Sequence, residues 1–382
     1  MNRLKLFLLV FVLSACSNSV QTPIREGEIP TSNRAVISPG PSPTKMSPPA
    51  PASALPAPAV TPEPDIQLTR ISEWNYSSGL VEWFSDSSQF AILSQGQLEI
   101  FDTKTQKTKW TKSLMPYQAD SGLAITPDGM HIAVYSYGYK GGFKIFNAAT
   151  GDLQAEKPGT GDCFVDYFPG GMLFINNKTL LAGFRAEKTT DDRPLSVVMW
   201  NISPLHCIGR KLEIDVKESE PGEVEGLTLS PDANYLVLIA THSYQNVYEG
   251  HVTVWDTATY KQVCSLNGTY AAFRPSNGLL AVVDGKEEGL SYFDVIKCQV
   301  TQTLNMPLYD SEQQIIFTPD SKYIILGRDR DLEIRNADNA TLVSEYSLDK
   351  KIDGIKISPN GEFLLLSHLG ENGNISFWKI QR

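Results

Sequence analysis

The stretch from Ser230 to Asp256 decides the fold. It contains the turn Ser230-Pro231-Asp232, the apolar run Tyr235-Leu236-Val237-Leu238-Ile239 and the segment Val252-Thr253-Val254-Trp255-Asp256. Proline fixes φ, and Ser and Asp side chains bond to nearby backbone groups, so Ser-Pro-Asp is typical of a tight turn. The run after the turn is short and apolar, and Val252 to Trp255 alternates with the period of a half-buried strand. The stretch therefore predicts a hairpin bend between short β-strands.

This pattern occurs seven times along the chain of 382 residues. A short run precedes each turn and a more apolar run follows it, and Pro169-Gly170-Gly171 is expected to be the turn of the third repeat. The aligned turn residues are separated by 42, 42, 62, 44, 44 and 40 positions, so one insertion interrupts a steady period. The aligned residues are Asp86, Asp128, Gly170, Asp232, Ser276, Asp320 and Asn360.

Each repeat continues with a third strand that ends in an aromatic or bulky residue, as in Ile145-Phe146-Asn147. A polar turn and a fourth strand follow, and four antiparallel strands in a unit of about 42 residues are typical of a β-propeller blade. At Val254-Trp255-Asp256, with the Ser/Thr-Pro-Asp turns before it, the chain resembles the WD-repeat β-propeller family. The resemblance extends from Ile66 to Arg382 and implies an all-β, seven-bladed propeller.

The resemblance to the WD-repeat family is incomplete. No Gly-His pair opens a blade, because Gly250-His251 precedes a third strand instead, and Trp occupies only three of the seven third-strand columns. The His-Ser-Asp-Trp hydrogen-bond network of that family is therefore not expected in this chain.

The two ends of the repeat region predict how the ring closes. Arg382 follows directly after a third strand, so the last blade lacks its fourth strand. The segment Gln67 to Ser72, placed just before the first complete blade, can supply that strand and remove an exposed sheet edge. The propeller domain is therefore expected to comprise residues 66–382, with its N-terminal strand in the last blade.

The N-terminus has the features of a secreted bacterial lipoprotein. Arg3 and Lys5 precede an apolar run from Leu6 to Leu13, which is typical of a signal peptide and too short to span a bilayer. The run ends in Leu13-Ser14-Ala15-Cys16, which resembles the bacterial lipobox. This resemblance implies a lipoprotein signal peptide over residues 1–15, lipidation of Cys16, and an extracytoplasmic, lipid-anchored protein of the bacterial cell envelope. A plain secretory signal with an incidental cysteine is the alternative, and the choice between inner and outer membrane stays open.

Residues 16–65 are expected to form a disordered, proline-rich tether behind the lipidated cysteine. The segment from Ser17 to Pro64 contains twelve of the 24 prolines and no aromatic residue. Such a segment cannot bury enough apolar area to offset its ordering entropy.

Composition and motifs argue against several classes of function. Lys and Arg total 33 against 43 Asp and Glu, a net charge of −10, which offers no basic surface for nucleic acid. The sequence lacks the GxSxG, HExxH, P-loop and EF-hand motifs, so a non-enzymatic protein without metal or cofactor is expected. His242 and His251, with Glu249, fall in one expected loop and could bind a metal, but such histidines are more often ordinary surface residues. A hydrolase with carboxylates around the central channel is the less favoured alternative.

The expected loops between second and third strands and between blades hold most of the inserted length. Tyrosines are common in recognition surfaces, since a Tyr side chain combines a large contact area with a polar tip. These loops predict a binding platform for a protein, peptide or glycan on one face of a monomeric propeller; simple tolerance of long loops is the alternative. The loops are Met115–Ser121, Ser136–Gly142, Ala186–Pro194, Asp215–Glu225, His242–His251 and Asn305–Glu312, and their candidate binding residues are Tyr117, Tyr137, Tyr139, Tyr244, Tyr248 and Tyr309.

A second resemblance supplies an alternative function. The segment Asp102-Thr103-Lys104-Thr105-Gln106, followed by Trp110, resembles a quinoprotein-type blade, with Gln106 in place of the usual Gly. Only one repeat carries the full pattern, so a bound quinone is not expected. The same likeness is found in lipid-anchored propellers of the outer-membrane protein assembly machinery, and a role as an envelope assembly component is therefore the alternative.

Four cysteines follow Cys16, at Cys163, Cys207, Cys264 and Cys298. An even number in an oxidising compartment permits three full pairings. The sequence leaves both disulfides and buried free thiols open.

Overall fold

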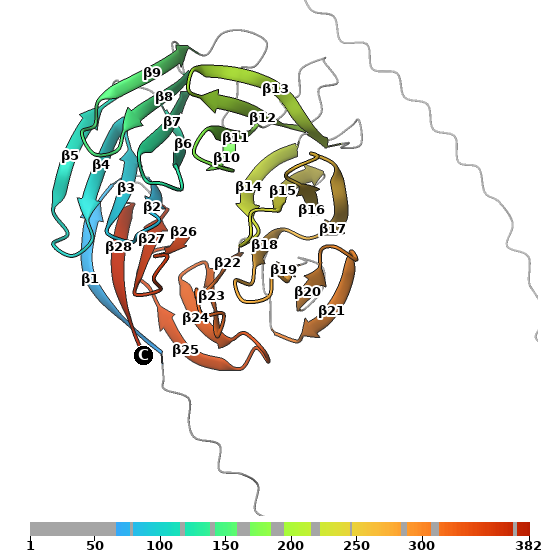
Figure 1. The fold of residues 1–382 in the computed structure, drawn as a ribbon. Coiled ribbons are helices and arrows are strands. Elements are labelled where there is room, and N and C mark those ends of the chain that lie inside the picture. Colours follow the sequence, from blue (N-terminus) through green and yellow to red (C-terminus); the bar gives the residue numbers. More distant parts are fainter. Residues whose placement is uncertain are drawn as a thin grey trace, which may run out of the picture. The chain divides into compact units, whose positions relative to one another are not determined.

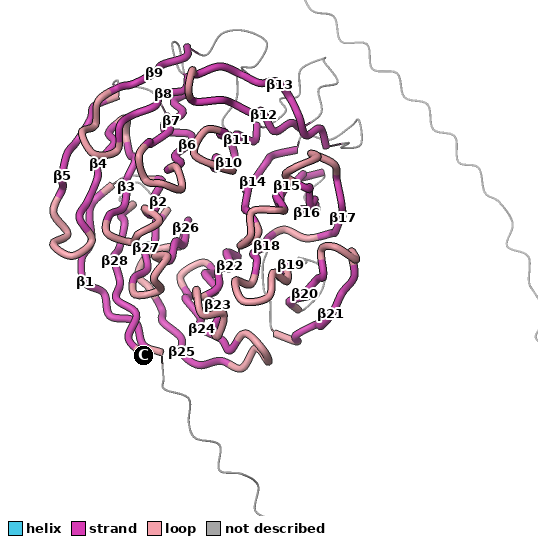
Figure 2. The backbone as a smooth tube through the Cα atoms, viewed as in Figure 1, coloured by secondary structure: helices cyan, strands magenta, loops and turns pink. Residues whose placement is uncertain are grey.

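The computed structural model describes residues 66–76, 79–114, 119–137, 142–158, 169–184, 195–214, 222–244, 247–283, 289–306, 313–369 and 373–382. All of these residues belong to one compact unit, Thr61–Arg382. The predicted signal peptide, the tether and Cys16 lie outside the described residues. Figure 2 shows strands and loops throughout the described part, where no helix is present that is long and apolar enough to cross a membrane.

Seven four-stranded antiparallel sheets form a ring, which confirms the seven-bladed β-propeller predicted from the repeats (Figure 1). Blade 1 consists of β2 (Leu80–Trp83), β3 (Gln89–Ser94), β4 (Gln97–Asp102) and β5 (Thr108–Ser113), and blade 2 of β6 (Ala119–Ile125), β7 (His131–Tyr137), β8 (Gly142–Asn147) and β9 (Leu153–Pro158). Blade 3 consists of β10 (Pro169–Phe174), β11 (Thr179–Phe184), β12 (Leu195–Ile202) and β13 (Leu205–Ile214).

The remaining blades repeat the same order from the innermost to the outermost strand. Blade 4 consists of β14 (Gly222–Leu229), β15 (Tyr235–Tyr244), β16 (Val247–Asp256) and β17 (Gln262–Asn267), and blade 5 of β18 (Tyr270–Phe273), β19 (Leu280–Val283), β20 (Leu290–Asp294) and β21 (Gln299–Leu304). Blade 6 consists of β22 (Gln313–Phe317), β23 (Tyr323–Arg328), β24 (Asp331–Asn336) and β25 (Leu342–Ser347). Blade 7 consists of β26 (Ile352–Ile357), β27 (Phe363–His368), β28 (Asn374–Gln381) and, at its outer edge, β1 (Gln67–Asn75).

Blade 7 confirms the predicted closure of the ring. β1 runs antiparallel to β28, with Gln67 opposite Gln381 and Asn75 opposite Asn374. The first and last segments of the propeller therefore share one sheet, and Figure 1 shows them side by side.

An aromatic cluster seals the junction between blades 7 and 1. The Phe90 ring is stacked on Phe377 with centroids 5.6 Å apart, and Trp83 meets Phe90 edge-on at 5.3 Å. Trp74, from β1, packs on Phe90 at 5.7 Å. Rings at these separations attract one another beyond the burial of their area, so the junction where the chain closes is one of the densest aromatic parts of the core.

The Ser/Thr-Pro-Asp turns are held by their own side chains. In blade 2, Thr126 Oγ1 donates to Asp128 Oδ1 at 2.7 Å, while the backbone N–H groups of His131 and Met130 donate to Thr126 Oγ1 and Asp128 Oδ1. The same Ser/Thr hydroxyl to Asp/Asn bond recurs in blades 4, 6 and 7. These residue types therefore recur because each turn needs them to satisfy its backbone.

The prediction of a turn at Pro169-Gly170-Gly171 is wrong. These residues form the start of β10, where Pro169 lies opposite Phe184 and Gly171 opposite Gly183. The turn of blade 3 lies further along, where Asn176 Oδ1 accepts hydrogen bonds from the backbone N–H groups of Lys178 and Thr179. Gly171 is needed inside the strand because a Cβ there would lie 3.1 Å from the backbone nitrogen of Leu227 in the next blade.

The prediction of a loop over His242–His251 is also wrong. β15 and β16 each extend to ten residues and pair down to Tyr244 opposite Val247. Threonine, tyrosine and valine favour strands, so the inserted length of blade 4 continues the sheet as a longer hairpin.

Candidate binding surfaces

The ring has two faces. Turns between the first and second strands and between the third and fourth strands of each blade lie on one, which we call the turn face. Connections between second and third strands and between blades lie on the other, the loop face.

The turns of the turn face are linked from blade to blade. Asn360 N–H donates to Ser87 Oγ between blades 7 and 1, and Ser85 Oγ donates to the carbonyl of Pro127 in blade 2. Further bonds join blades 2 and 3, 5 and 6, and 6 and 7: Asp128 N–H to Asn177 Oδ1, Ser276 N–H to Ser321 Oγ, and Arg382 Nη1 to Asp320 Oδ2. Many polar groups of this face are thus used by neighbouring turns.

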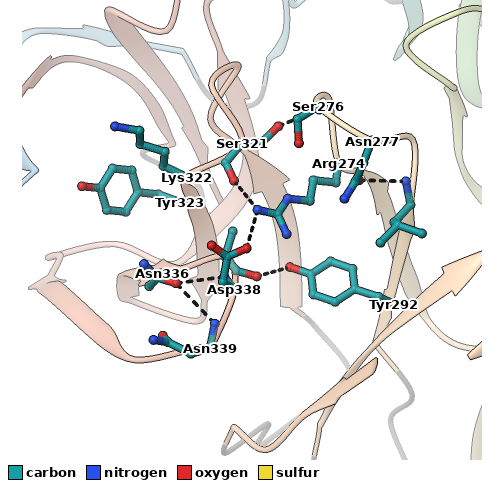
Figure 3. Close-up of polar contacts among 12 residues, drawn as sticks. Arg274, Ser276, Asn277, Tyr292, Ser321, Lys322, Tyr323, Asn336, Asp338 and Asn339 are labelled. Carbon is teal, nitrogen blue, oxygen red and sulfur yellow. Dashed lines mark hydrogen bonds and ion pairs between the residues drawn. The ribbon is translucent and has the colours of Figure 1, made fainter. Parts of the chain in front are cut away.

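Blade 5 departs from the common turn because Arg274 replaces the Ser or Thr. Figure 3 shows its guanidinium reaching into blade 6, where Nη2 donates to the Ser321 carbonyl at 3.0 Å and to Asp338 Oδ1 at 2.6 Å. The guanidinium carbon also lies 5.9 Å from the centroid of the Tyr292 ring, and the Tyr292 hydroxyl donates to the Ala337 carbonyl. Burial raises the pKa of Tyr292 to about 12, so this hydroxyl stays a donor.

We expect Arg274→Ala to lower the free energy of unfolding by about 1–3 kcal/mol, because a hydrogen-bonded and largely buried side chain is lost between two blades. Its side chain is 13% exposed, whereas that of Asp338 is 73% exposed. Asp338→Ala should therefore cost less than about 1 kcal/mol, the range of a solvent-screened ion pair. Urea denaturation of both variants checks this order, and equal losses would contradict it.

The third-to-fourth-strand turn of blade 1 gives a structural role to the quinoprotein-like residues. The backbone N–H and the hydroxyl of Thr105 both donate to Asp102 Oδ1, which holds the pKa of Asp102 below its usual value. Asp256 and Thr259 repeat the arrangement in blade 4. Trp110 Nε1 donates to the Ala148 carbonyl of blade 2. These residues fix a turn and a contact between blades.

The innermost strands of blades 6, 7 and 1 are bridged by side chains. Gln314 accepts from the Ile355 N–H and donates to the Asp353 carbonyl, while Trp83 Nε1 donates to the Lys356 carbonyl. Glu82 pairs with Lys356 at 2.8 Å and raises the pKa of that lysine. Burial raises the pKa of Asp353, the residue inserted at the β-bulge of β26.

The predicted tyrosine surface stays untested. Tyr117, Tyr139 and Tyr309 lie outside the described residues. Tyr137 ends β7 opposite Ala119, and in the hairpin of blade 4 Tyr244 lies opposite Val247 and Tyr248 lies opposite Ser243. The side chains of these three tyrosines lie outside the described part. The same is true of His242 and Glu249, which face each other in the β15–β16 register, so the metal hypothesis is also untested.

A disulfide joins blades 4 and 5. Cys264 in β17 is bonded to Cys298, in the turn before β21, with the two Cα atoms 5.5 Å apart. Cys207 is disulfide-bonded as well. These three cysteines are therefore disulfide-bonded and are not free thiols, a choice that the sequence alone leaves open. The pairing is a tertiary contact between two blades, which cysteine spacing alone could not reveal.

Comparison with known proteins supports the fold and does not identify a family. No known protein-family profile matches the chain, and no curated protein matches its sequence. A solved structure described as "Crystal Structure of Mitotic Checkpoint Complex" is similar, with a TM-score of 0.64 and 16% sequence identity. The match covers 88% of this chain and 100% of that one. At this identity the likeness supports the propeller fold alone.

Proposed function

We propose that this protein is an exported, lipid-anchored propeller that binds a protein, peptide or glycan and catalyses no reaction. The disulfide between Cys264 and Cys298 carries the proposal of export. Disulfides persist mainly in oxidising compartments outside the cytosol. The N-terminal Arg3, Lys5, apolar run and Cys16 supply a signal and an acylation site in agreement with that location.

The loop face supports the second part of the proposal. The turn face uses many of its polar groups in bonds between neighbouring blades. At the loop face, by contrast, additional residues extend the β15–β16 hairpin, and the sequence predicts the six candidate tyrosines on this face. A rigid ring that presents longer segments on one side is suited to binding a partner. The similar structure described above is a protein complex by its title, which agrees with a role in binding.

The anchor is tested by Cys16→Ser. Wild-type protein should incorporate labelled fatty acid and sediment with membranes, and the variant should do neither while keeping its melting temperature. Two acyl signals are needed for stable attachment, and each buried methylene contributes about 0.8 kcal/mol, so the effect on sedimentation should be nearly complete. Equal labelling of both proteins would refute lipidation at this cysteine.

The binding face is tested by affinity capture from envelope extracts. A variant with all six candidate tyrosines changed to Ala should lose the partner that the wild type recovers, by roughly 100-fold or more if two of them are energetic centres of the contact. A variant with the same six changed to Phe keeps the rings and serves as the matched control. Identical partners recovered by the wild type and the Ala variant would overturn the proposed surface.

A further inference from the structure

The seven outermost strands protect their exposed edges unequally. Each carries a β-bulge against its neighbouring strand, which disturbs the edge. Five of them also contain charged residues, a second device against edge-to-edge pairing. These are Lys109 and Lys112 in β5, Glu156 and Lys157 in β9, Arg210, Lys211 and Glu213 in β13, Glu345 in β25, and Arg70 and Glu73 in β1.

The other two outer strands, β17 and β21, contain no charged residue. They belong to adjacent blades, the same two that the Cys264–Cys298 disulfide joins. In β21 the five residues Gln299–Thr303 are all exposed. Val300 is 54% exposed, and Ile296, in the turn before this strand, is 71% exposed. An uncharged, open strand edge thus lies next to exposed aliphatic side chains.

We propose that this edge is the contact between two copies of the chain, with β21 of each copy pairing antiparallel across a two-fold axis. The free backbone N–H and C=O groups of an edge strand are a template for such pairing. A contact of this kind is self-complementary, as two-fold interfaces require.

Charge limits where two copies of the chain can meet. The chain has a net charge of −10, which opposes association of two copies through charged surfaces. Any register of β21 against itself sets no charged residue opposite another. The same arrangement of β5 would place Lys109 opposite Lys112, and like charges directly opposite one another are destabilising. The uncharged edge is therefore where two copies meet at the lowest electrostatic cost.

The disulfide prepares this edge for pairing. It holds the turn that leads into β21 against β17 of blade 4, with the Cα atoms 5.5 Å apart. Fixing the two outer edges beforehand reduces the ordering that dimerisation would otherwise require. The inference replaces the monomer expected from the sequence, and it is independent of the proposed ligand and anchor.

Sedimentation equilibrium of the chain carrying Cys16→Ser, which removes any acyl group, tests the proposal. An edge contact of modest area predicts a dimer that forms reversibly over roughly 1–100 μM. Val300→Lys should weaken it by about 10-fold or more, and Ile296→Lys, in the turn, should act in the same direction. Leu153→Lys is the matched control: Leu153 lies opposite Phe146 in blade 2 as Val300 lies opposite Phe293 in blade 5, and it is 46% exposed.

Circular dichroism melts establish that each variant is folded. A single species of monomer mass at every concentration up to about 200 μM would overturn the inference, since even weak edge pairing is populated there. A dimer that Leu153→Lys weakens as much as Val300→Lys would also overturn it. Slower hydrogen exchange of the β21 amides in the dimer than in the monomeric variant is the expected confirmation.

Discussion

A chain that lacks residues 66–75 will lose the cooperative thermal transition of the propeller. The deletion removes β1, the fourth strand of blade 7, and with it Ile66 and Leu68, which are 0% and 7% exposed in the core between blades 6 and 7. It also removes the bond from the Leu68 N–H to the Tyr346 hydroxyl and leaves β28 with an open edge. Two buried aliphatic side chains alone represent about 4 kcal/mol or more, a large part of the 5–15 kcal/mol that typically separates folded from unfolded states.

Point variants of β1 show which of its side chains contribute to stability while the strand itself stays in place. Leu68→Ala should cost about 2–4 kcal/mol, whereas Ile71→Ala should cost less than about 0.5 kcal/mol, because Ile71 lies at the bulge and is 39% exposed. Differential scanning calorimetry gives both values. A truncated chain that melts like the parent would show that blade 7 does not depend on β1.

Gly250→Ala will destabilise the protein by about 3 kcal/mol or more, because the added methyl group overpacks backbone against backbone. A Cβ at Gly250 would lie 2.2 Å from the Gly268 carbonyl oxygen and 2.8 Å from the Thr269 Cα, both in the connection between blades 4 and 5. The Gly268 N–H also donates to the Gly250 carbonyl at 2.9 Å, so the two segments cannot separate without losing that bond.

Gly226→Ala is the control for this prediction. Gly226 lies in the same blade, yet its Cβ would meet only Ile239 Cδ1, at the ordinary distance of 3.6 Å. The free energy of unfolding of this variant should change by less than about 1 kcal/mol, because the methyl group fits and because the unfolded chain loses conformational freedom, which favours folding. Chemical denaturation compares the two, and a Gly250 variant as stable as the Gly226 variant would contradict the close approach.

The architecture was predictable because its signals are local. Each turn carries residues that bond to their own backbone, as Thr126 and Asp128 do, and these recur once per blade. The closure of the ring by an N-terminal strand is predicted from the sequence, and the pairing of β1 with β28 confirms it. The turn of blade 3 is predicted wrongly because Asn176 forms a turn without proline, while Gly171 serves a close approach of two blades.

The candidate surfaces were less predictable because they depend on contacts between distant residues. Nothing around Arg274 in the sequence indicates that its guanidinium meets Asp338 in the next blade. The partner of Cys264 is fixed by the packing of two blades, and the absence of charge in β17 and β21 has meaning only once they are seen to be adjacent outer strands. The six tyrosines remain a prediction from sequence.

The pairing of Gln67 with Gln381 has a consequence for the covalent continuity of the ring. We call the junction between β1 and β28 the seam of the ring. Hydrogen bonds and packing hold it rather than a peptide bond, and Gln67 and Gln381 lie side by side in the sheet of blade 7. A circular permutant that joins Arg382 to residue 66 through a short linker and opens between β15 and β16 would move the seam to blade 4. The permuted propeller should still fold, because every blade keeps its four strands and its two neighbouring blades wherever the chain begins.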